Sequence, residues 1–379
     1  MAKALFINWK KRLYYACFTP FHWLMRKRYG EAFFPKKAGK PKKILLCNLS
    51  ALGDVFLSTF AISALKKAHP NAEIALLVSP ASKVVGEGCP GVDRIHILSP
   101  WLVPSDSFLK KLRKYLLFHL IEKRKILKEL GSHSYDWAIN FYPFFSDVIP
   151  LFLRVKIPVR VGFDALGYRT LFSHTVSWER GKYLTDLYWR LLETVGIEST
   201  HKTHFFSPWI QIPRRPLPQL KEEYFLFHMG SATPDKDLPS SFWLALLEEF
   251  QKKDHQVYFT GKGEEQYQLI DAIVSDPRDN LCDLLSWEEF LQVIAHAKGV
   301  FSVDTVIVHI AAAMQTPYAV FYQKTPDPDL WRPDSERGLA FIKREEASAH
   351  HIHRKDERLI WVDDFDPNQV FAKVEEVLQ

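Results

Sequence analysis

Short apolar runs alternate with segments of helical periodicity along most of the chain. Residues 42–48 (KKILLCN) predict a buried parallel strand, because strands covered on both faces are almost continuously apolar. Apolar positions at helical spacing follow over residues 55–69, Pro70 ends that helix, and a second apolar run occupies residues 73–78. Strand, loop, helix and strand in this order form the unit of a doubly wound α/β sheet. Further strands are predicted at 94–98, 137–141 and 159–162.

The same alternation restarts after a proline-rich break. Residues 208–220 carry four prolines and no periodic pattern, which is typical of a linker between domains. Beyond it, strands are predicted at 224–228, 256–260, 299–303 and 318–322, with helices at 240–253, 264–274, 287–297 and 306–314. The predicted organisation is therefore an N-terminal extension, a first α/β domain, a linker, a second α/β domain and a tail with a terminal helix, at residues 1–40, 41–207, 208–220, 221–345 and 346–379.

Composition agrees with two domains and narrows the choice of partners. The chain has 379 residues, of which 47% are hydrophobic, enough for two cores. Its net charge of +6 permits an anionic partner but is too small to indicate nucleic acid. The four cysteines are scattered without a CxxC pair, which favours a reducing cytosol over a disulfide framework or a zinc site. The apolar stretch at 14–25 is too short to span a membrane and lacks a signal-peptide cleavage site.

Two segments mix basic and apolar residues. Residues 1–40 either pack on the first domain or form a helix on a membrane surface, with lysines on lipid headgroups. Residues 108–130 are rich in Lys, Arg and Leu, and here an amphipathic helix facing water is favoured over a membrane or acceptor surface, because charged helix faces usually meet solvent.

Three strand-to-helix turns carry candidate chemistry. In LSALGD (49–54), Gly53 permits a tight turn, and Asp54 can either accept a proton from an attacking hydroxyl or cap the helix. HMGS (228–231) is followed by Lys236, which suits a phosphate group, although an ordinary loop would look similar. SVDT (302–305) precedes a helix whose N-terminus could hold an anion, with His309 in its first turns.

Together these turns resemble the heptosyltransferase family of bacterial glycosyltransferases. RVGFD at 160–164 and the pattern over 183–197 add to the resemblance, which covers about residues 42–335. It implies a GT-B fold, with two Rossmann-like domains facing across a cleft. It further implies inverting transfer, without a cofactor or bound metal, from a nucleotide sugar, usually ADP-heptose, to a lipid-linked saccharide acceptor. Such an enzyme would be cytoplasmic and peripheral on the inner face of the inner membrane.

The resemblance also assigns roles. Asp54 matches the proposed catalytic base, and Lys236 matches the lysine that neutralises the departing diphosphate. The donor-binding candidates are Gly230, Ser231, Glu264, Glu265, Asp304, Thr305 and His309, with either Glu264 or Glu265 on the donor ribose. The acceptor-binding candidates are Ser50, Gly53, Arg154, Arg160 and Arg169, because arginines suit carboxylate and phosphate geometry.

Two departures from the family pattern keep other functions open. Val306 and Gln323 stand where the family usually has glycine, which alters the expected donor pocket. A non-catalytic nucleotide-sugar-binding protein and a GT-B-shaped epimerase are the alternatives. Asp327-Pro328-Asp329 spells the DxD of metal-dependent transferases outside its usual context, and His350, His351 and His353 offer no fixed third ligand, so neither supports a metal site.

Overall fold

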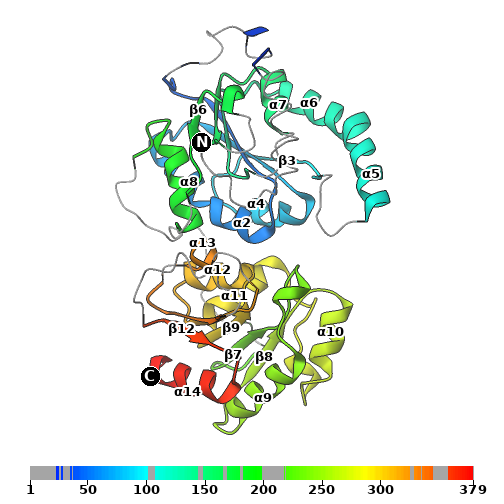
Figure 1. Cartoon of the computed structure of the whole chain (residues 1–379), viewed down its shortest axis with the longest axis vertical. Helices are drawn as coiled ribbons and strands as arrows, with labels where there is room; N and C mark the ends of the chain where they lie inside the picture. The colour runs from blue at the N-terminus through cyan, green and yellow to red at the C-terminus, as the bar shows by residue number, and fades with distance from the viewer. Residues whose placement is uncertain are drawn as a thin grey trace. The chain divides into compact units, whose positions relative to one another are not determined.

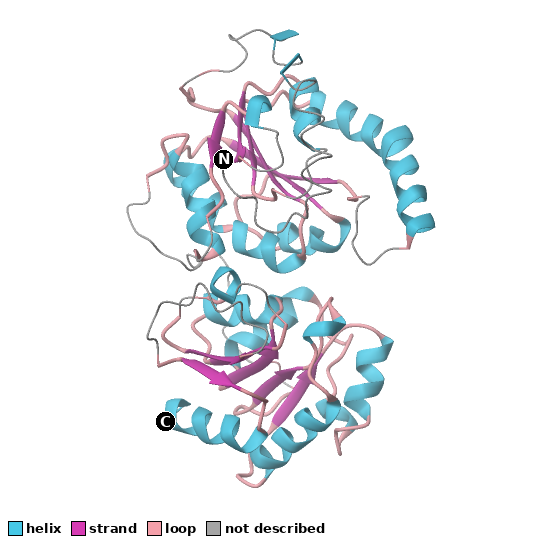
Figure 2. Ribbon diagram, in the orientation of Figure 1, coloured by secondary structure: helices cyan, strands magenta, loops and turns pink. Residues whose placement is uncertain are grey.

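The computed structural model describes residues 35, 37–100, 107–143, 148–164, 169–179, 182–198, 217, 219–324, 328–333, 335–344 and 357–378, together with residues 23, 24, 27 and 28. The chain forms two compact units, the first with residues up to 180 and 184–203, the second with residues 181–183 and those from 204 onward. Each unit is an α/β domain built on one parallel sheet (Figures 1 and 2). Among the described residues, no helix is both long and apolar enough to cross a membrane.

The first sheet has the Rossmann strand order β3-β2-β1-β4-β5-β6, with every neighbouring pair parallel. Almost every residue of its central strands is buried, as the apolar runs predict. The strands are β1 (Lys43–Asn48), β2 (Glu73–Val78), β3 (Arg94–Ile97), β4 (Trp137–Asn140), β5 (Val159–Phe163) and β6 (His174–Val176). The helices are α2 (Leu52–Ser58), α3 (Phe60–Ala68), α4 (Lys83–Glu87), α5 (Phe108–Leu117), α6 (Lys123–Gly131), α7 (Val148–Arg154) and α8 (Leu184–Glu193).

Two predicted helices are interrupted in the structure. The helix expected over 55–69 breaks at Thr59, where the hydroxyls of Ser58 and Thr59 donate to the carbonyls of Val55 and Phe56 at 2.7 and 2.6 Å. Hydroxyls that bond back to the preceding turn bend helices. The helix expected over 108–130 contains a π-helical turn, Phe118–Glu122, between α5 and α6.

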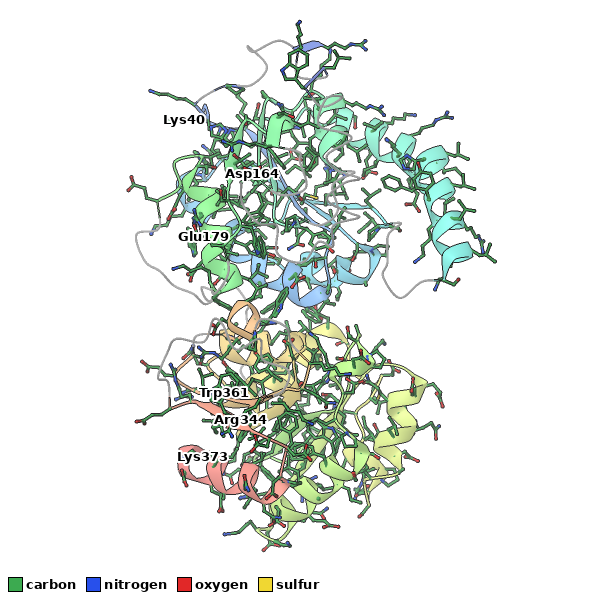
Figure 3. The ribbon with its side chains drawn as sticks, viewed as in Figure 1. Lys40, Asp164, Glu179, Arg344, Trp361 and Lys373 are labelled. Carbon is green, nitrogen blue, oxygen red and sulfur yellow. The ribbon has the colours of Figure 1, made fainter. Side chains whose placement is uncertain are left out.

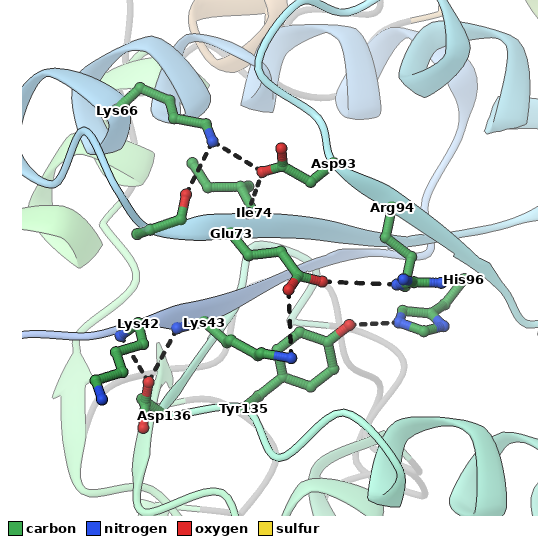
Figure 4. Close-up of polar contacts among 11 residues, drawn as sticks. Lys42, Lys43, Lys66, Glu73, Ile74, Asp93, Arg94, His96, Tyr135 and Asp136 are labelled. Atoms are coloured by element: carbon green, nitrogen blue, oxygen red, sulfur yellow. Dashed lines mark hydrogen bonds and ion pairs between the residues drawn. The ribbon is translucent and has the colours of Figure 1, made fainter.

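Charged side chains hydrogen-bond to the ends of strands in the first sheet (Figure 4). Asp136 accepts from the backbone N–H groups of Lys42 and Lys43 at 2.7 and 2.9 Å. Asp93 accepts from the backbone N–H of Ile74 at 2.7 Å and pairs with Lys66 at 2.8 Å. These bonds lie at the amino ends of the strands, so they fix the sheet at the edge opposite its ligand-binding side.

The second sheet has the order β12-β11-β10-β9-β7-β8, also entirely parallel. An aromatic core that includes Phe227, Trp243, Phe301 and Phe371 joins α9 and α14 to one face, while α11 and α12 cover the other (Figure 2). The strands are β7 (Phe225–His228), β8 (Val257–Thr260), β9 (Gly299–Val303), β10 (Tyr318–Tyr322), β11 (Gly338–Lys343) and β12 (Leu359–Val362). The helices are α9 (Ser240–Gln251), α10 (Glu264–Asp271), α11 (Trp287–His296), α12 (Val306–Ala313), α13 (Pro328–Trp331) and α14 (Pro367–Leu378).

The C-terminal residues differ from the expected tail. The terminal helix forms, as α14, but it packs on α9, and β12 pairs with β11 as the last strand of the sheet. Residues 357–378 therefore belong to the second domain. Most of the predicted linker and most of the N-terminal extension lie outside the described residues.

Candidate functional site

The first unit places Asp54 at the point where its sheet changes winding direction. Strands β1 and β4 are neighbours from which the chain winds in opposite directions, and ligands of open α/β sheets bind at the carboxyl ends of such strands. Asp54 lies in the first turn of α2, directly after β1, and its side chain is partly exposed. The hydroxyl of Ser50 donates to Asp54 Oδ2. Asn48 supports the turn, since its Nδ2 donates to the Asp54 carbonyl at 2.9 Å and its Oδ1 accepts from the Ser50 N–H at 3.2 Å.

Asn140 is a second candidate at this point, and sequence reasoning missed it. It ends β4, pairs with Cys47 of β1, and is 1% exposed. Its Nδ2 donates to the carbonyl of Tyr142 at 2.9 Å, but its Oδ1 has no hydrogen-bond partner in the described part of the chain. Buried polar atoms are nearly always hydrogen-bonded, so an acceptor left open beside the Asp54 turn points to a ligand that donates. The signal in the sequence was an asparagine closing an apolar strand.

The three arginines that were expected to bind the acceptor lie at different positions in the first unit. Arg160 is fully buried within β5, where its guanidinium donates to the carbonyls of Ile157, Pro158 and Leu171. It supports the fold, and its assignment to the acceptor is wrong.

Arg154 and Arg169 lie at different edges of the sheet. Arg154 ends α7 just before β5 begins, so it lies at the amino edge of the sheet, opposite the edge at which Asp54 follows β1, and it is the less well placed of the two. Arg169 is mostly exposed, and its Nη1 bonds Asp164 Oδ2 at 3.1 Å, which holds it at the carboxyl end of β5 (Asp164 is labelled in Figure 3). Of the three, Arg169 is the best placed acceptor candidate.

The second unit brings together two motifs that are far apart in the sequence. Its switch point lies between β7 and β9. Lys236, at the end of a short 3₁₀ helix after β7, has its Nζ 2.6 Å from Oδ2 of Asp304, which directly follows β9. The carboxylate is 6% exposed and the lysine side chain 25%. The pair is thus partly buried, and it fixes an ammonium group at the ligand-binding edge.

Two buried polar atoms without hydrogen-bond partners in the described part of the chain lie near this ion pair. His309 Nδ1 on α12 has no hydrogen-bond partner among the described residues, and burial lowers the pKa of His309 to about 4, so the ring is neutral at pH 7. The hydroxyl of Tyr322 is likewise unpartnered, and burial, with the nearby Asp304 charge, raises its pKa well above 10, so it keeps its proton. Phe321 pairs with Val303, which sets Tyr322 beside Asp304. Sequence reasoning missed Tyr322, because it ends an ordinary apolar strand.

The remaining donor candidates occupy the loops after β7 and β8. A Cβ on Gly230 would lie 1.7 Å from Nε2 of Gln266 on α10, so a larger residue there would require the Gln266 side chain to move. The hydroxyl of Ser231 is engaged within its own loop, donating to the carbonyl of Thr233 and accepting from its N–H. Gly263, at φ +95°, turns the chain into α10.

Glu264 and Glu265 are both exposed in the first turn of α10, but they differ in their contacts. Glu264 accepts from Gln268 of the same helix at 2.8 Å. Burial raises the pKa of Asp237 in the loop after β7, and the charge of Glu265 raises it further, so these two carboxylates lie near each other. Glu265 is therefore the glutamate nearer this loop, and both stay candidates for the donor ribose.

The departures from the family pattern are visible in the structure. Val306 begins α12 and is partly exposed at the helix N-terminus, and the buried Oε1 of Gln323 has no hydrogen-bond partner in the described part of the chain. No group of three or more His, Cys, Asp or Glu residues that could hold a metal occurs among the described residues. Asp327 and the three histidines at 350, 351 and 353 lie outside them.

Comparison with known proteins agrees with the fold. A curated relative, lipopolysaccharide heptosyltransferase 3 of Escherichia coli K12, is 24% identical over 86% of this chain and 95% of its own. The fold is that of Escherichia coli heptosyltransferase WaaC, solved with ADP (17% identity, TM-score 0.66, 88% of this chain and 99% of that one).

The same fold occurs in Escherichia coli ADP-heptose LPS heptosyltransferase II (18% identity, TM-score 0.65, 89% of this chain and 98% of that one). Both solved proteins are GT-B heptosyltransferases. The family model described as glycosyltransferase family 9 (heptosyltransferase) matches residues 123–360, more than half of the chain, including Lys236 and Asp304 but not Asp54. The chain therefore belongs to glycosyltransferase family 9, the heptosyltransferase family, and is a glycosyltransferase.

Proposed function

We propose that this glycosyltransferase moves a sugar, with heptose the first candidate, from a nucleoside diphosphate to a hydroxyl of a lipid-linked saccharide such as the lipopolysaccharide inner core. The Lys236–Asp304 ion pair and the unpartnered polar atoms of His309 and Tyr322 carry the proposal. A diphosphate supplies the anionic oxygens to which the Lys236 ammonium and the Tyr322 hydroxyl can donate, and to which His309 donates in the tautomer that carries its proton on Nδ1. ADP-heptose is the first donor to test, because ADP and heptose both occur in the names of similar proteins.

Lys236 stabilises the departing diphosphate in this proposal. Its ammonium has three N–H donors, of which Asp304 accepts one, so others can reach phosphate oxygens. Asp304 carries the same charge sign as phosphate and therefore serves as the positioning residue for Lys236. Thr305, the first N–H groups of α12, neutral His309 and the Tyr322 hydroxyl complete the phosphate site. Glu265 binds the ribose hydroxyls.

Asp54 acts as the base on the acceptor. It takes the proton from the attacking hydroxyl as the new bond forms between that oxygen and the anomeric carbon. The bond from this carbon to the diphosphate breaks on the opposite side, and the nucleoside diphosphate leaves with the electron pair. A single displacement of this kind inverts the anomeric configuration. Lys236 and the α12 N-terminus take the place of a metal, so the reaction is metal-independent.

The acceptor determines where the reaction takes place. Asn140 Oδ1 accepts from an acceptor hydroxyl, and Arg169 pairs with an acidic group of the core saccharide. Since the acceptor is lipid-linked, we place the enzyme at the cytoplasmic face of the inner membrane as a peripheral protein.

The direct test is transfer by the purified full chain with ADP-heptose and a heptose-deficient core acceptor, with and without EDTA. We expect release of ADP, an inverted linkage by NMR, and an unchanged rate in EDTA. Lys236→Ala should lower kcat by roughly 10²–10³, as loss of a charge-stabilising donor does. Lys298→Ala, which removes an exposed lysine paired with Glu223 at the amino end of β9, is the matched control and should have no effect.

Other outcomes would replace the proposal. Val306 and Gln323 motivate the alternative of a protein that binds the donor without transferring it; ADP binding with no product for any acceptor would support that alternative. Conversion of the nucleotide sugar in the absence of acceptor would indicate an epimerase. A rate abolished by EDTA and restored by a divalent cation would contradict metal independence.

A further inference from the structure

The helix formed by α5 and the π-helical turn exposes an unusual amount of apolar surface. Of the twelve large hydrophobic residues that are exposed in the described part of the chain, seven fall within residues 109–121, with exposed fractions from 40% to 76%. We call these seven the leucine-rich face. They are Leu109, Leu112, Tyr115, Leu116, Leu117, Leu120 and Ile121.

These side chains are not a displaced part of the core. The same continuous helix already buries Phe118, Ile126 and Leu130 against the first unit, and Phe118 is fully buried. The main neighbour of α5 is the π-helical turn that continues it. In Figure 1 α5 runs along the outer margin of the unit, and Figure 3 shows side chains standing out from it. Leu109, Leu112 and Leu116 follow the i, i+3, i+7 spacing of one helix face, and Leu120 extends it into the π-helical turn.

The charge of the same segment is strongly positive. Residues 108–130 contain eight Lys or Arg and two Asp or Glu, a net charge of +6, which equals the net charge of the whole chain. No acidic residue occurs in residues 108–121. Residues 108–121, which carry the leucine-rich face, thus hold four cations and no acid; the other segment with a large positive excess is residues 1–40, with ten Lys or Arg and one Glu.

We propose that the leucine-rich face docks this enzyme on an anionic lipid bilayer. Apolar side chains on a helix with lysines and arginines beside them match an interfacial helix, whose leucines enter the acyl boundary while the cations meet anionic headgroups. A protein partner fits less well, because the cores of protein interfaces are depleted in lysine, whereas here Lys110, Arg113 and Lys114 are interleaved with the leucines. From the charges alone, a helix that faces water is favoured for this segment. The exposed leucines favour a membrane surface instead.

Binding of the full-length protein to vesicles tests the proposal. Sedimentation with phosphatidylglycerol-containing vesicles and with phosphatidylcholine vesicles should show binding only to the former, weakening as salt rises. The variant Leu112→Ser/Leu116→Ser/Leu120→Ser should bind anionic vesicles at least about tenfold more weakly, because it removes only exposed apolar surface. Lys110→Gln/Arg113→Gln/Lys114→Gln should weaken binding and lower its salt dependence.

The matched control replaces three exposed leucines elsewhere, as Leu244→Ser/Leu269→Ser/Leu284→Ser, and should bind like the wild type. Transfer to a delipidated acceptor should be unchanged in all these variants, so that a failed docking surface is distinguishable from a failed assignment of the reaction. Unchanged vesicle binding by the leucine variant would overturn the proposal. So would a concentration-dependent dimer of the wild type that the leucine variant abolishes, because the face would then be covered by a second copy of the chain.

Discussion

At the scale of single residues, the candidate site of each unit combines polar atoms that are already hydrogen-bonded with polar atoms that are not. In the second unit Lys236 is held by Asp304, and in the first unit Asp54 accepts from Ser50, so these charged groups are oriented by their neighbours. Asn140 Oδ1, His309 Nδ1 and the Tyr322 hydroxyl, in contrast, are buried without a hydrogen-bond partner in the described part of the chain. Leaving such atoms unpaired costs about 1–3 kcal/mol each, which a ligand that bonds them would recover.

Tyr322→Phe tests whether one of these atoms belongs to the donor site. The change removes only a hydroxyl without a partner, so the unliganded protein should keep or gain stability. A hydrogen bond to a charged phosphate contributes about 1.5–3 kcal/mol, so ADP binding measured by calorimetry should weaken roughly ten- to hundredfold.

Tyr318→Phe on the same strand is the control. Its hydroxyl donates to the carbonyl of Pro333 at 3.3 Å, so its loss should lower stability by about 1 kcal/mol and leave ADP binding alone. Equal ADP affinity in the wild type and Tyr322→Phe would exclude the hydroxyl from the donor site.

Asp54→Asn tests the base. Asparagine keeps the shape of the side chain and an acceptor for the Ser50 hydroxyl, but it cannot take up a proton at neutral pH. We expect kcat to fall by roughly 10²–10⁴ while ADP binding and thermal stability stay at wild-type values. A variant that transfers sugar at the normal rate would show that another group removes the proton.

At the scale of elements, the sequence predicts best the alternation of apolar strands and helices that repeats along the chain. Nine of the twelve strands are short apolar runs bounded by turns and were predicted. The three that were not predicted are β6, β11 and the edge strand β12. β6 has three residues, two of them polar, and β12 is half-buried, so neither shows a distinct pattern.

Features decided by side-chain contacts escaped prediction. The break at Thr59 comes from hydroxyls that bond to helix carbonyls, and the π-helical turn has no signal in the periodicity. Arg160 was misassigned because its sequence position does not reveal that the side chain points into the core. Asp54, Lys236 and Asp304 could be named because polar residues at strand-to-helix turns are visible in the sequence, whereas an unpartnered buried atom such as Asn140 Oδ1 is visible only in the structure.

Phe118→Ala tests how the π-helical turn joins α5 to the first unit. Phe118 is fully buried in the core, so its truncation should lower the free energy of unfolding by about 3–5 kcal/mol. Leu120→Ala, two residues away in the same turn, removes a side chain that is 59% exposed and should change it by less than about 0.5 kcal/mol. Chemical denaturation followed by circular dichroism separates the two; a similar small effect for both would show that Phe118 does not anchor the helix.

At the scale of the whole molecule, two buried histidines make stability depend on pH. His228 ends β7 and bonds Thr260, His309 lies on α12, and burial lowers the pKa of each to about 4. Both are in the second unit, at the edge where the donor site is proposed. Acid should therefore destabilise the region in which the donor site is proposed.

The sign follows from the difference between the folded and unfolded states. In the unfolded chain a histidine takes up its proton near pH 6.5, whereas in the folded chain it does so only near pH 4. The contribution of each neutral histidine to the free energy of unfolding is fully present above pH 6.5. It is lost as the pH decreases from 6.5 to 4, which lowers the free energy of unfolding by about 3 kcal/mol for each histidine. Tm measured from pH 7 to pH 4.5 should drop, and the drop should be markedly smaller in His228→Gln/His309→Asn. His296→Gln, at the half-buried end of α11, should leave the slope unchanged; an equal slope in the wild type and the double variant would place the acid sensitivity elsewhere in the chain.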